Sequence, residues 1–176
     1  MPDLRYRFLL FVSLFFLSSL ALATSGPVLE RYISSPEKVG EGRLTYLFWD
    51  VYDASLFAHE GEWQAEQPFA LSLRYLRALK GRDIADRSIE EIRRHGYKDE
   101  IKMASWHHLL TQILPDVNEG NVITGIYTKD KTTVFYLSDE KIGEITDPEF
   151  GHHFFGIWLN QQTSAPKLRK QLLALP

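Results

Sequence analysis

The segment that most constrains the fold is Arg43–Ala58, which reads RLTYLFWDVYDASLFA. If its positions alternate as in a strand, bulky apolar residues occur on both sides. One side carries Leu44, Tyr46, Phe48, Tyr52 and Leu56, and the other carries Leu47, Trp49, Val51 and Phe57. A strand that is apolar on both faces must be covered on both faces. The segment therefore predicts a strand inside a layered structure, with Asp50 and Asp53 marking a bend or a strand switch.

The remaining hydrophobic patterns predict strands and helices in separate blocks. Period-2 patterns favour strands and period-3.6 patterns favour helices. The expected strands are Val28–Ile33, Phe69–Leu76, Val117–Thr128, Thr132–Leu137 and Lys141–Ile145. The expected helices are a run through Ala85, Ile89 and Ile92 that ends at Gly96, then Asp99–Leu114, Glu149–Asn160 and a last helix from Pro166. This order indicates an α+β domain, with helices on one face of a sheet.

The amino-terminal residues have the parts of a secretory signal peptide. Arg5 and Arg7 precede the apolar run Phe8–Leu20, and Ala21-Leu-Ala23 is a small-residue cleavage site. A retained membrane anchor is the alternative, but a spanning helix needs about 20 apolar residues. We therefore expect residues 1–23 to be removed, which leaves a single domain, 24–176, in the periplasm with no stable membrane anchor.

Composition excludes several classes of function. The chain has 176 residues, no cysteine and a formal net charge of −3. It therefore has no disulfide, cysteine–metal site or thiol nucleophile, and no basic excess that would suit a nucleic-acid partner. Phosphate-binding glycine loops are absent, so no nucleotide cofactor is expected. The His107-His108 and His152-His153 pairs lack metal-ligand spacing, so no metal is expected, and nothing in the sequence indicates an oligomeric state.

Two clusters are candidates for ligand contacts. The first lies within Trp49–Asp53, and the second is Arg74–Arg77 at the end of a predicted strand. Arg74 or Arg77 would suit a ligand carboxylate, because a guanidinium binds a carboxylate through two hydrogen bonds. The alternative is that these arginines pair with Asp50 or Asp53. The 4 Trp, 8 Tyr and 11 Phe residues likewise suit either an apolar pocket or ordinary core packing.

Several of these segments, taken in order, resemble the bacterial chalcone-isomerase-like family. The resemblance rests on Val39–Arg43, Val51–Phe57, Phe69–Leu76 with Lys80-Gly81, Phe155–Leu159 and Ser164–Arg169. It covers most of the chain after the leader. It implies an open-faced β-sandwich, in which a curved antiparallel sheet and a helical layer enclose an apolar cleft. Members of the family either cyclise chalcones or bind fatty acids without catalysis.

The resemblance also implies that the cyclase residues are missing. The position expected for a catalytic threonine falls on Leu47, and the early arginine is absent from 34–38. No tyrosine occurs between Arg77 and Gly96, and the late threonine or serine position falls near Ile157. A cyclase needs polar groups to stabilise an oxyanion, so we assign no catalytic residue.

Three functions are therefore compatible with the sequence. The first is a non-catalytic periplasmic binder of a small apolar or carboxylate ligand such as a fatty acid. Its expected contacts are Arg74, Tyr75, Arg77, Trp49, Tyr52 and Trp158. The second is an isomerase or intramolecular lyase of the same fold that uses other residues. The third is an envelope scaffold whose cleft is filled by its own side chains.

Overall fold

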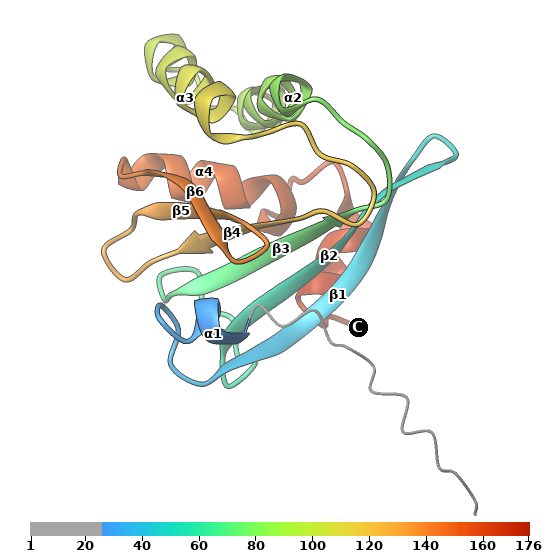
Figure 1. Cartoon of the computed structure of the whole chain (residues 1–176), viewed down its shortest axis with the longest axis vertical. Coiled ribbons are helices and arrows are strands. Elements are labelled where there is room, and N and C mark those ends of the chain that lie inside the picture. The colour runs from blue at the N-terminus through green and yellow to red at the C-terminus, as the bar shows by residue number, and fades with distance from the viewer. Residues whose placement is uncertain (1–25) are drawn as a thin grey trace, which may run out of the picture.

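The computed structural model describes residues 26–176, which form one antiparallel sheet and a helical layer (Figure 1). Each strand pairs with the next strand in the sequence. The strands are β1 (Pro36–Tyr46), β2 (Trp49–His59), β3 (Phe69–Tyr75), β4 (Val122–Tyr127), β5 (Thr133–Leu137) and β6 (Glu140–Ile145). This α+β sheet with its helical layer confirms the predicted fold class. The predicted signal peptide lies outside the described residues.

The helices are α1 (Gly26–Leu29), α2 (Gly81–Arg94), α3 (Glu100–Ile113), α4 (Pro148–Leu159) and α5 (Pro166–Leu172). Figure 1 shows α2, α3 and α4 together on one side of the sheet. Helices α3 and α4 begin where the sequence predicts, because Asp99 and Asp147 accept hydrogen bonds from backbone N–H groups of the first turn. Within residues 26–176, no helix is long and apolar enough to cross a bilayer.

The two faces of the sheet have separate apolar clusters. On β3, Leu71, Leu73 and Tyr75 pack into the main core with the helices. The intervening residues of β3 point to the other face, as alternation along a strand requires. We call this the second face. There Ala70 packs in a smaller cluster with Ile126, with α1 and with the turns that follow α1. The sheet is thus covered by helices on one face and by a short amino-terminal segment on part of the other.

Helix α5 packs directly against β1 because glycine lines that contact. A Cβ atom added at Gly40 would lie 2.2 Å from the Gln171 carbonyl oxygen and 2.6 Å from the Leu172 carbonyl oxygen. Both are backbone atoms at the end of α5, so a side chain at this position requires the helix to move. Close approach of two backbones is one reason that a strand carries glycine.

The segment Arg43–Ala58, predicted as a strand with a bend or strand switch at Asp50 and Asp53, reverses direction earlier, at Leu47-Phe48. This segment is a hairpin whose arms end at the pair Tyr46–Trp49. Leu47 and Phe48 form the turn, and Leu47 has a positive φ of 53°. The sequence concealed the turn because its residues are as apolar as the arms. Leu47 and Phe48 are exposed rather than buried, so their apolar character does not arise from packing in the core.

The predicted strand Val28–Ile33 is also wrong. Pro27 falls in the first turn of α1, where a helix accepts proline. The Ile33 N–H donates to the Leu29 carbonyl at 2.8 Å, so the chain continues as turns. Val28, Leu29 and Ile33 are nevertheless buried against the second face. The short apolar spacing was interpreted as a strand, and it did not reveal the turns.

Candidate ligand-binding site

A line of aromatic rings runs between the sheet and α4. It begins at Trp63, whose ring contacts Phe69 with a centroid separation of 5.9 Å, and continues to Phe155 at 4.8 Å. Phe154 then links Phe155 to Trp158, with 5.4 Å between centroids at each step. Edge-to-face pairs of this kind stabilise the packing of two layers. They also form a continuous apolar path across the interior.

At the Trp63 end, the layers leave a pocket of about 100 Å³. It is lined by Trp63, Ala65, Phe69, Tyr127, Gly151, His152, Phe155, Gly156, Leu159 and Asn160. The loop before β3 brings Trp63 there through a turn in which Glu60 and Gly61 have positive φ angles. Gly151 allows the close approach of α4, because a Cβ atom there would lie 2.8 Å from the Tyr127 ring. Four aromatic side chains, Trp63, Phe69, Tyr127 and Phe155, line the pocket together with smaller and polar residues.

The pocket has hydrogen-bond donors without matching acceptors. The indole Nε1 of Trp63 is buried and has no hydrogen-bond partner within residues 26–176. The Asn160 side-chain oxygen accepts from the Gln162 N–H at 2.8 Å, which leaves its NH2 group as a donor. His152 is exposed and adds an imidazole ring to the same wall. A buried donor with no partner is costly, and because solvent does not reach this nitrogen, a ligand oxygen would bond to it only after the neighbouring side chains moved.

The other end of the aromatic line is closed by Tyr52. The Trp158 Nε1 donates to the Tyr52 hydroxyl at 2.9 Å. The Tyr52 ring lies edge-on to Tyr75 at 6.0 Å. Burial raises the pKa of both hydroxyls above the ordinary value for tyrosine, and the negative charge of Glu91 adds to the increase for Tyr52. Both phenols are therefore neutral at physiological pH.

A buried carboxylate lies beside this closed end. The Glu91 side chain is 4% exposed, and its Oε1 lies 2.5 Å from the Arg87 Nη2. The Arg94 Nη1 is farther away, at 3.8 Å. Because α2 supplies all three residues, the pair is local to that helix. Arg87 is half exposed and its Nη1 also lies 3.3 Å from Glu90, so its charge is shared between two carboxylates and solvent.

The predicted ligand contacts do not all lie together. Tyr52, Tyr75 and Trp158 meet in the core between the sheet and the helices. Arg74 points to the second face, where it donates to Asp53 at 3.0 Å. Arg77 lies over the ring of Trp49, 5.2 Å from its centroid, and Trp49 is 64% exposed. The six residues thus lie in three places: Tyr52, Tyr75 and Trp158 in the core, Arg74 on the second face, and Arg77 with Trp49 at the hairpin.

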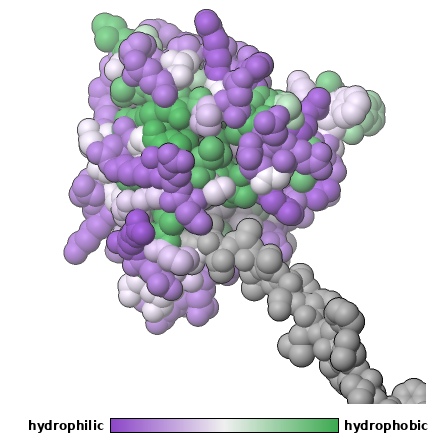
Figure 2. Space-filling model, in the orientation of Figure 1, coloured by the Kyte–Doolittle hydropathy of each residue, from purple (hydrophilic) through white to green (hydrophobic). Residues whose placement is uncertain are grey.

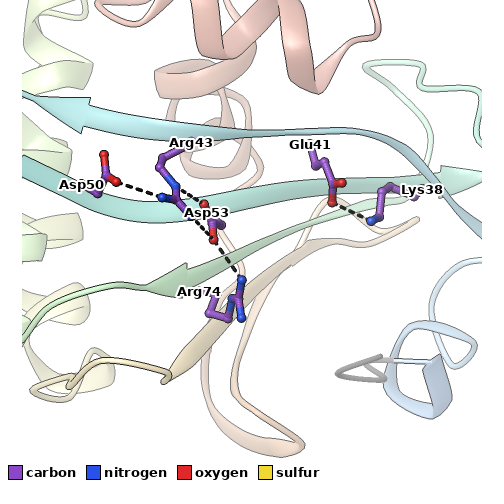
Figure 3. Close-up of polar contacts among 6 residues, drawn as sticks. All are labelled: Lys38, Glu41, Arg43, Asp50, Asp53 and Arg74. Carbon is purple, nitrogen blue, oxygen red and sulfur yellow. Dashed lines mark hydrogen bonds and ion pairs between the residues drawn. The ribbon is translucent and has the colours of Figure 1, made fainter. Parts of the chain in front are cut away.

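Arginine–aspartate pairing, the alternative considered for Arg74, is present. Figure 3 shows Arg43 between Asp50 and Asp53, with Arg74 reaching Asp53 from β3. The Arg43 Nε lies 2.6 Å from Asp53 and its Nη1 lies 2.9 Å from Asp50. These bonds lower the pKa of the Asp53 carboxyl, chiefly through Arg43. Asp50 has a lowered pKa as well, chiefly because the Thr45 hydroxyl donates to it.

A second concavity lies between α2 and α3. This groove has a volume of about 410 Å³ and is more open and more charged than the aromatic pocket. Arg93 and Glu100 form an ion pair at 2.8 Å on its wall. His107 also lines it and bonds to Asp86. Residues 26–176 contain no group of three or more potential metal ligands. The charged walls suit an apolar ligand less well than the aromatic pocket does.

Comparison with known proteins identifies the family. The model of the chalcone isomerase-like family matches residues 40–174. The chain belongs to the chalcone isomerase-like family. An uncharacterized protein of Haemophilus influenzae is 29% identical over 138 residues, which cover 78% of this chain and 67% of that protein. The resemblance inferred from the sequence is therefore confirmed.

A solved structure shares the fold. The crystal structure of a fatty-acid binding protein from Arabidopsis thaliana matches with a TM-score of 0.62. The match covers 80% of this chain and 87% of that chain, at 12% sequence identity. At this identity the likeness concerns the fold. In this chain, Leu47, the counted position of the family's catalytic threonine, is at the exposed hairpin turn and is remote from the aromatic pocket.

Sequence reasoning missed the pocket itself. Trp63, Tyr127 and Phe155 come from a loop, a strand and a helix, and no local motif connects them. Phe155 was assigned to a buried helix, but its ring meets Phe69 only through tertiary packing. The signal that was available is the composition of 148–159, which is apolar nearly all round and so must contact something on two sides.

Proposed function

We propose that this chain is a non-catalytic binder of a small apolar acid, with short fatty acids as the first ligand class. The observation that carries the proposal is the aromatic pocket with an unpaired Trp63 N–H. An apolar tail matches the rings, and a carboxylate accepts from the indole and the Asn160 amide, with the His152 ring on the same wall. The fold shared with a fatty-acid binding protein supports the same ligand class.

The size of the pocket determines which acids are expected to bind. Sites for drug-sized ligands usually have about 300–1,000 Å³, and this pocket has about 100 Å³. A short acid fits with little rearrangement. A longer tail follows the aromatic line toward Trp158 and requires the rings of Phe154 and Phe155 to change rotamer. Affinity is therefore expected to fall from octanoate to palmitate, which is opposite to the order of their hydrophobicity.

We propose the periplasm as the compartment, on the basis of the leader in residues 1–23. The absence of cysteine makes the domain indifferent to an oxidising environment. Fusion of the first 23 residues to alkaline phosphatase tests this directly. Enzyme activity in the periplasmic fraction supports it, and a fusion retained in the cytoplasm contradicts it.

The binding proposal is tested with an acid and the matching alcohol. The chain from Thr24 is titrated with octanoate and with 1-octanol by calorimetry. Trp63→Phe keeps a ring but removes the N–H, so we expect about a tenfold loss of octanoate affinity, the scale of a hydrogen bond to a charged group. The octanol hydroxyl also accepts a hydrogen bond but carries no charge, so its affinity should fall less, by about threefold. Equal losses for acid and alcohol would contradict a carboxylate contact at Trp63.

The scaffold is the second candidate, and one observation favours it. The layers are closely packed, and their pocket is smaller than usual ligand sites. Failure of the wild-type chain to bind any acid from butyrate to palmitate would support the scaffold. An isomerase is supported less, because Tyr52 and Tyr75 are neutral phenols and the Trp158 N–H is already bonded.

A further inference from the structure

The tip of the β1–β2 hairpin exposes four consecutive large apolar residues. Tyr46 is 61% exposed, Leu47 71%, Phe48 96% and Trp49 64%. Apart from Ile101 and Leu175, they are the large hydrophobic residues that residues 26–176 leave exposed. Figure 2 shows this tip as a projection of white and green atoms at the upper right. Gathering such side chains in one turn is unfavourable in water, so their position requires an explanation.

The hairpin projects beyond the sheet and is held in place by its stem. Pairing of β2 with β3 begins at Tyr52, and the Leu76 N–H donates to the Val51 carbonyl at 3.0 Å, so the hairpin from Asp50 to its turn extends past β3 (Figure 1). On the stem, Asp50 accepts from the Thr45 hydroxyl at 2.7 Å and from Arg43 at 2.9 Å. These bonds cross the two strands just below the turn. The tip is therefore held away from the core rather than folded onto it.

A cation lies directly behind the apolar residues. The Arg77 guanidinium carbon is 5.2 Å from the centroid of the Trp49 ring. Within residues 26–176, no carboxylate lies within 4.0 Å of Arg77, whereas Arg43 and Arg74 are paired. From the turn toward the sheet, the hairpin thus presents first its apolar side chains and then the Arg77 guanidinium over the Trp49 ring. Below them lies the stem, where two arginines and two aspartates balance each other's charge.

We propose that this tip inserts reversibly into the interface of a lipid membrane. Tryptophan and tyrosine favour the headgroup region of a bilayer, while phenylalanine and leucine favour the acyl boundary. The unpaired charge of Arg77 is attracted to anionic headgroups. Insertion would move Leu47 and Phe48 furthest into the bilayer and leave Arg77 at the level of the phosphates.

The small area of the tip argues against a protein partner as the occupant. Aromatic side chains bury about 150–250 Å² each when fully covered, so complete coverage of this tip removes roughly 400–600 Å². A specific protein interface buries about 800 Å² per partner. A lipid surface needs no matching contour, so a narrow tip is sufficient.

The inference does not depend on the proposed ligand. Strand β2 runs from the tip to His59, and the aromatic pocket lies beyond that far end. A molecule attached through the tip would hold the pocket away from the membrane. Binding of a soluble acid and attachment to lipid are therefore separate properties, and either can fail without the other.

The test uses the chain from Thr24, because every described strand and helix lies in residues 26–176 and the apolar run Phe8–Leu20 would bind lipid by itself. Co-sedimentation is measured with vesicles of phosphatidylcholine containing 25% phosphatidylglycerol. Phe48→Ser is expected to lower the partition coefficient about tenfold or more. Ile101→Ser is the matched control, since Ile101 is 85% exposed on α3. The control should bind within twofold of wild type.

A second measurement does not need a variant. Trp49 is the exposed tryptophan, and Trp63, Trp106 and Trp158 are buried or half-buried. Vesicles should therefore shift the emission to shorter wavelength, and brominated lipid should quench it. No shift, or equal binding by Phe48→Ser and Ile101→Ser, would overturn the proposal. A wild-type dimer that Phe48→Ser converts to a monomer, without vesicle binding, would overturn it in favour of a second copy.

Discussion

Tyr52 and Tyr75 are adjacent in the core, but only the Tyr52 hydroxyl has a hydrogen-bond partner among the described residues. Removing the Tyr52 hydroxyl should therefore lower the unfolding free energy more than removing the Tyr75 hydroxyl. Tyr52→Phe leaves the Trp158 N–H, now 2.9 Å from the Tyr52 hydroxyl, without an acceptor. An unpaired buried donor costs about 1–3 kcal/mol of unfolding free energy. Tyr75→Phe is the matched control, because the Tyr75 hydroxyl has no hydrogen bond recorded within residues 26–176 and its ring lies in the same cluster. We expect it to change stability by less than about 0.5 kcal/mol.

The pair itself is measured by a double-mutant cycle in urea. Trp158→Phe leaves the Tyr52 hydroxyl without its hydrogen-bond donor and also removes part of a ring that is 7% exposed. We therefore expect the unfolding free energy to fall by about 2–4 kcal/mol. With Trp158 already changed, Tyr52→Phe should cost little, because no donor remains to be orphaned. The coupling should be about 1–2 kcal/mol. Additive losses, or equal effects of Tyr52→Phe and Tyr75→Phe, would refute the hydrogen bond as a source of stability.

Three further outcomes follow from the same structure. Gly40→Ala should lower the unfolding free energy by more than about 3 kcal/mol, because its Cβ meets α5 carbonyl oxygens. In the urea control Gly156→Ala, where the nearest atom is 3.8 Å away, stability should rise by about 1 kcal/mol. Burial raises the pKa of Tyr52 and Tyr75 above the unfolded value of 10.0. The contribution of these two neutral side chains to the unfolding free energy is therefore fully present below pH 10. These two groups should then lower the unfolding free energy by about 2.7 kcal/mol per pH unit above pH 10, measured as the difference from a variant with both replaced by phenylalanine; a slope unchanged by that replacement would refute this. Arg74→Gln should leave octanoate affinity within twofold in calorimetry, and a tenfold loss would instead assign the head group to the second face.

The elements predicted best from the sequence are those specified locally. The caps at Asp99 and Asp147 act within one helical turn, so their residues alone locate the helix starts. The hairpin of β4 and β5 was likewise recognisable, since polar residues separate two apolar runs. By contrast, the β1–β2 turn has no polar residue at its centre. Its place is decided by strand pairing and by the Asp50 contacts, which are not visible in a hydrophobic pattern.

The candidate site was less predictable because it depends on which face each residue occupies. Tyr75 and Arg74 are adjacent in sequence, yet one is buried in the core and the other is exposed on the second face. The pairing of Arg74 with Asp53 follows from the β2–β3 register, in which the two residues are opposite each other. Trp63 lies in a loop, where no periodicity constrains its position. Its role emerged only from the packing of α4 on the sheet.

The most direct test of ligand binding between the layers is fluorine NMR of the chain from Thr24 labelled with 5-fluorotryptophan. The four tryptophans report four places: the pocket at Trp63, the closed end at Trp158, helix α3 at Trp106 and the hairpin tip at Trp49. On titration with octanoate, we predict a saturable shift of the Trp63 resonance, with the Trp106 and Trp49 resonances unchanged. Unchanged resonances at saturating octanoate, or a shift confined to Trp49, would contradict a ligand site between the sheet and α4.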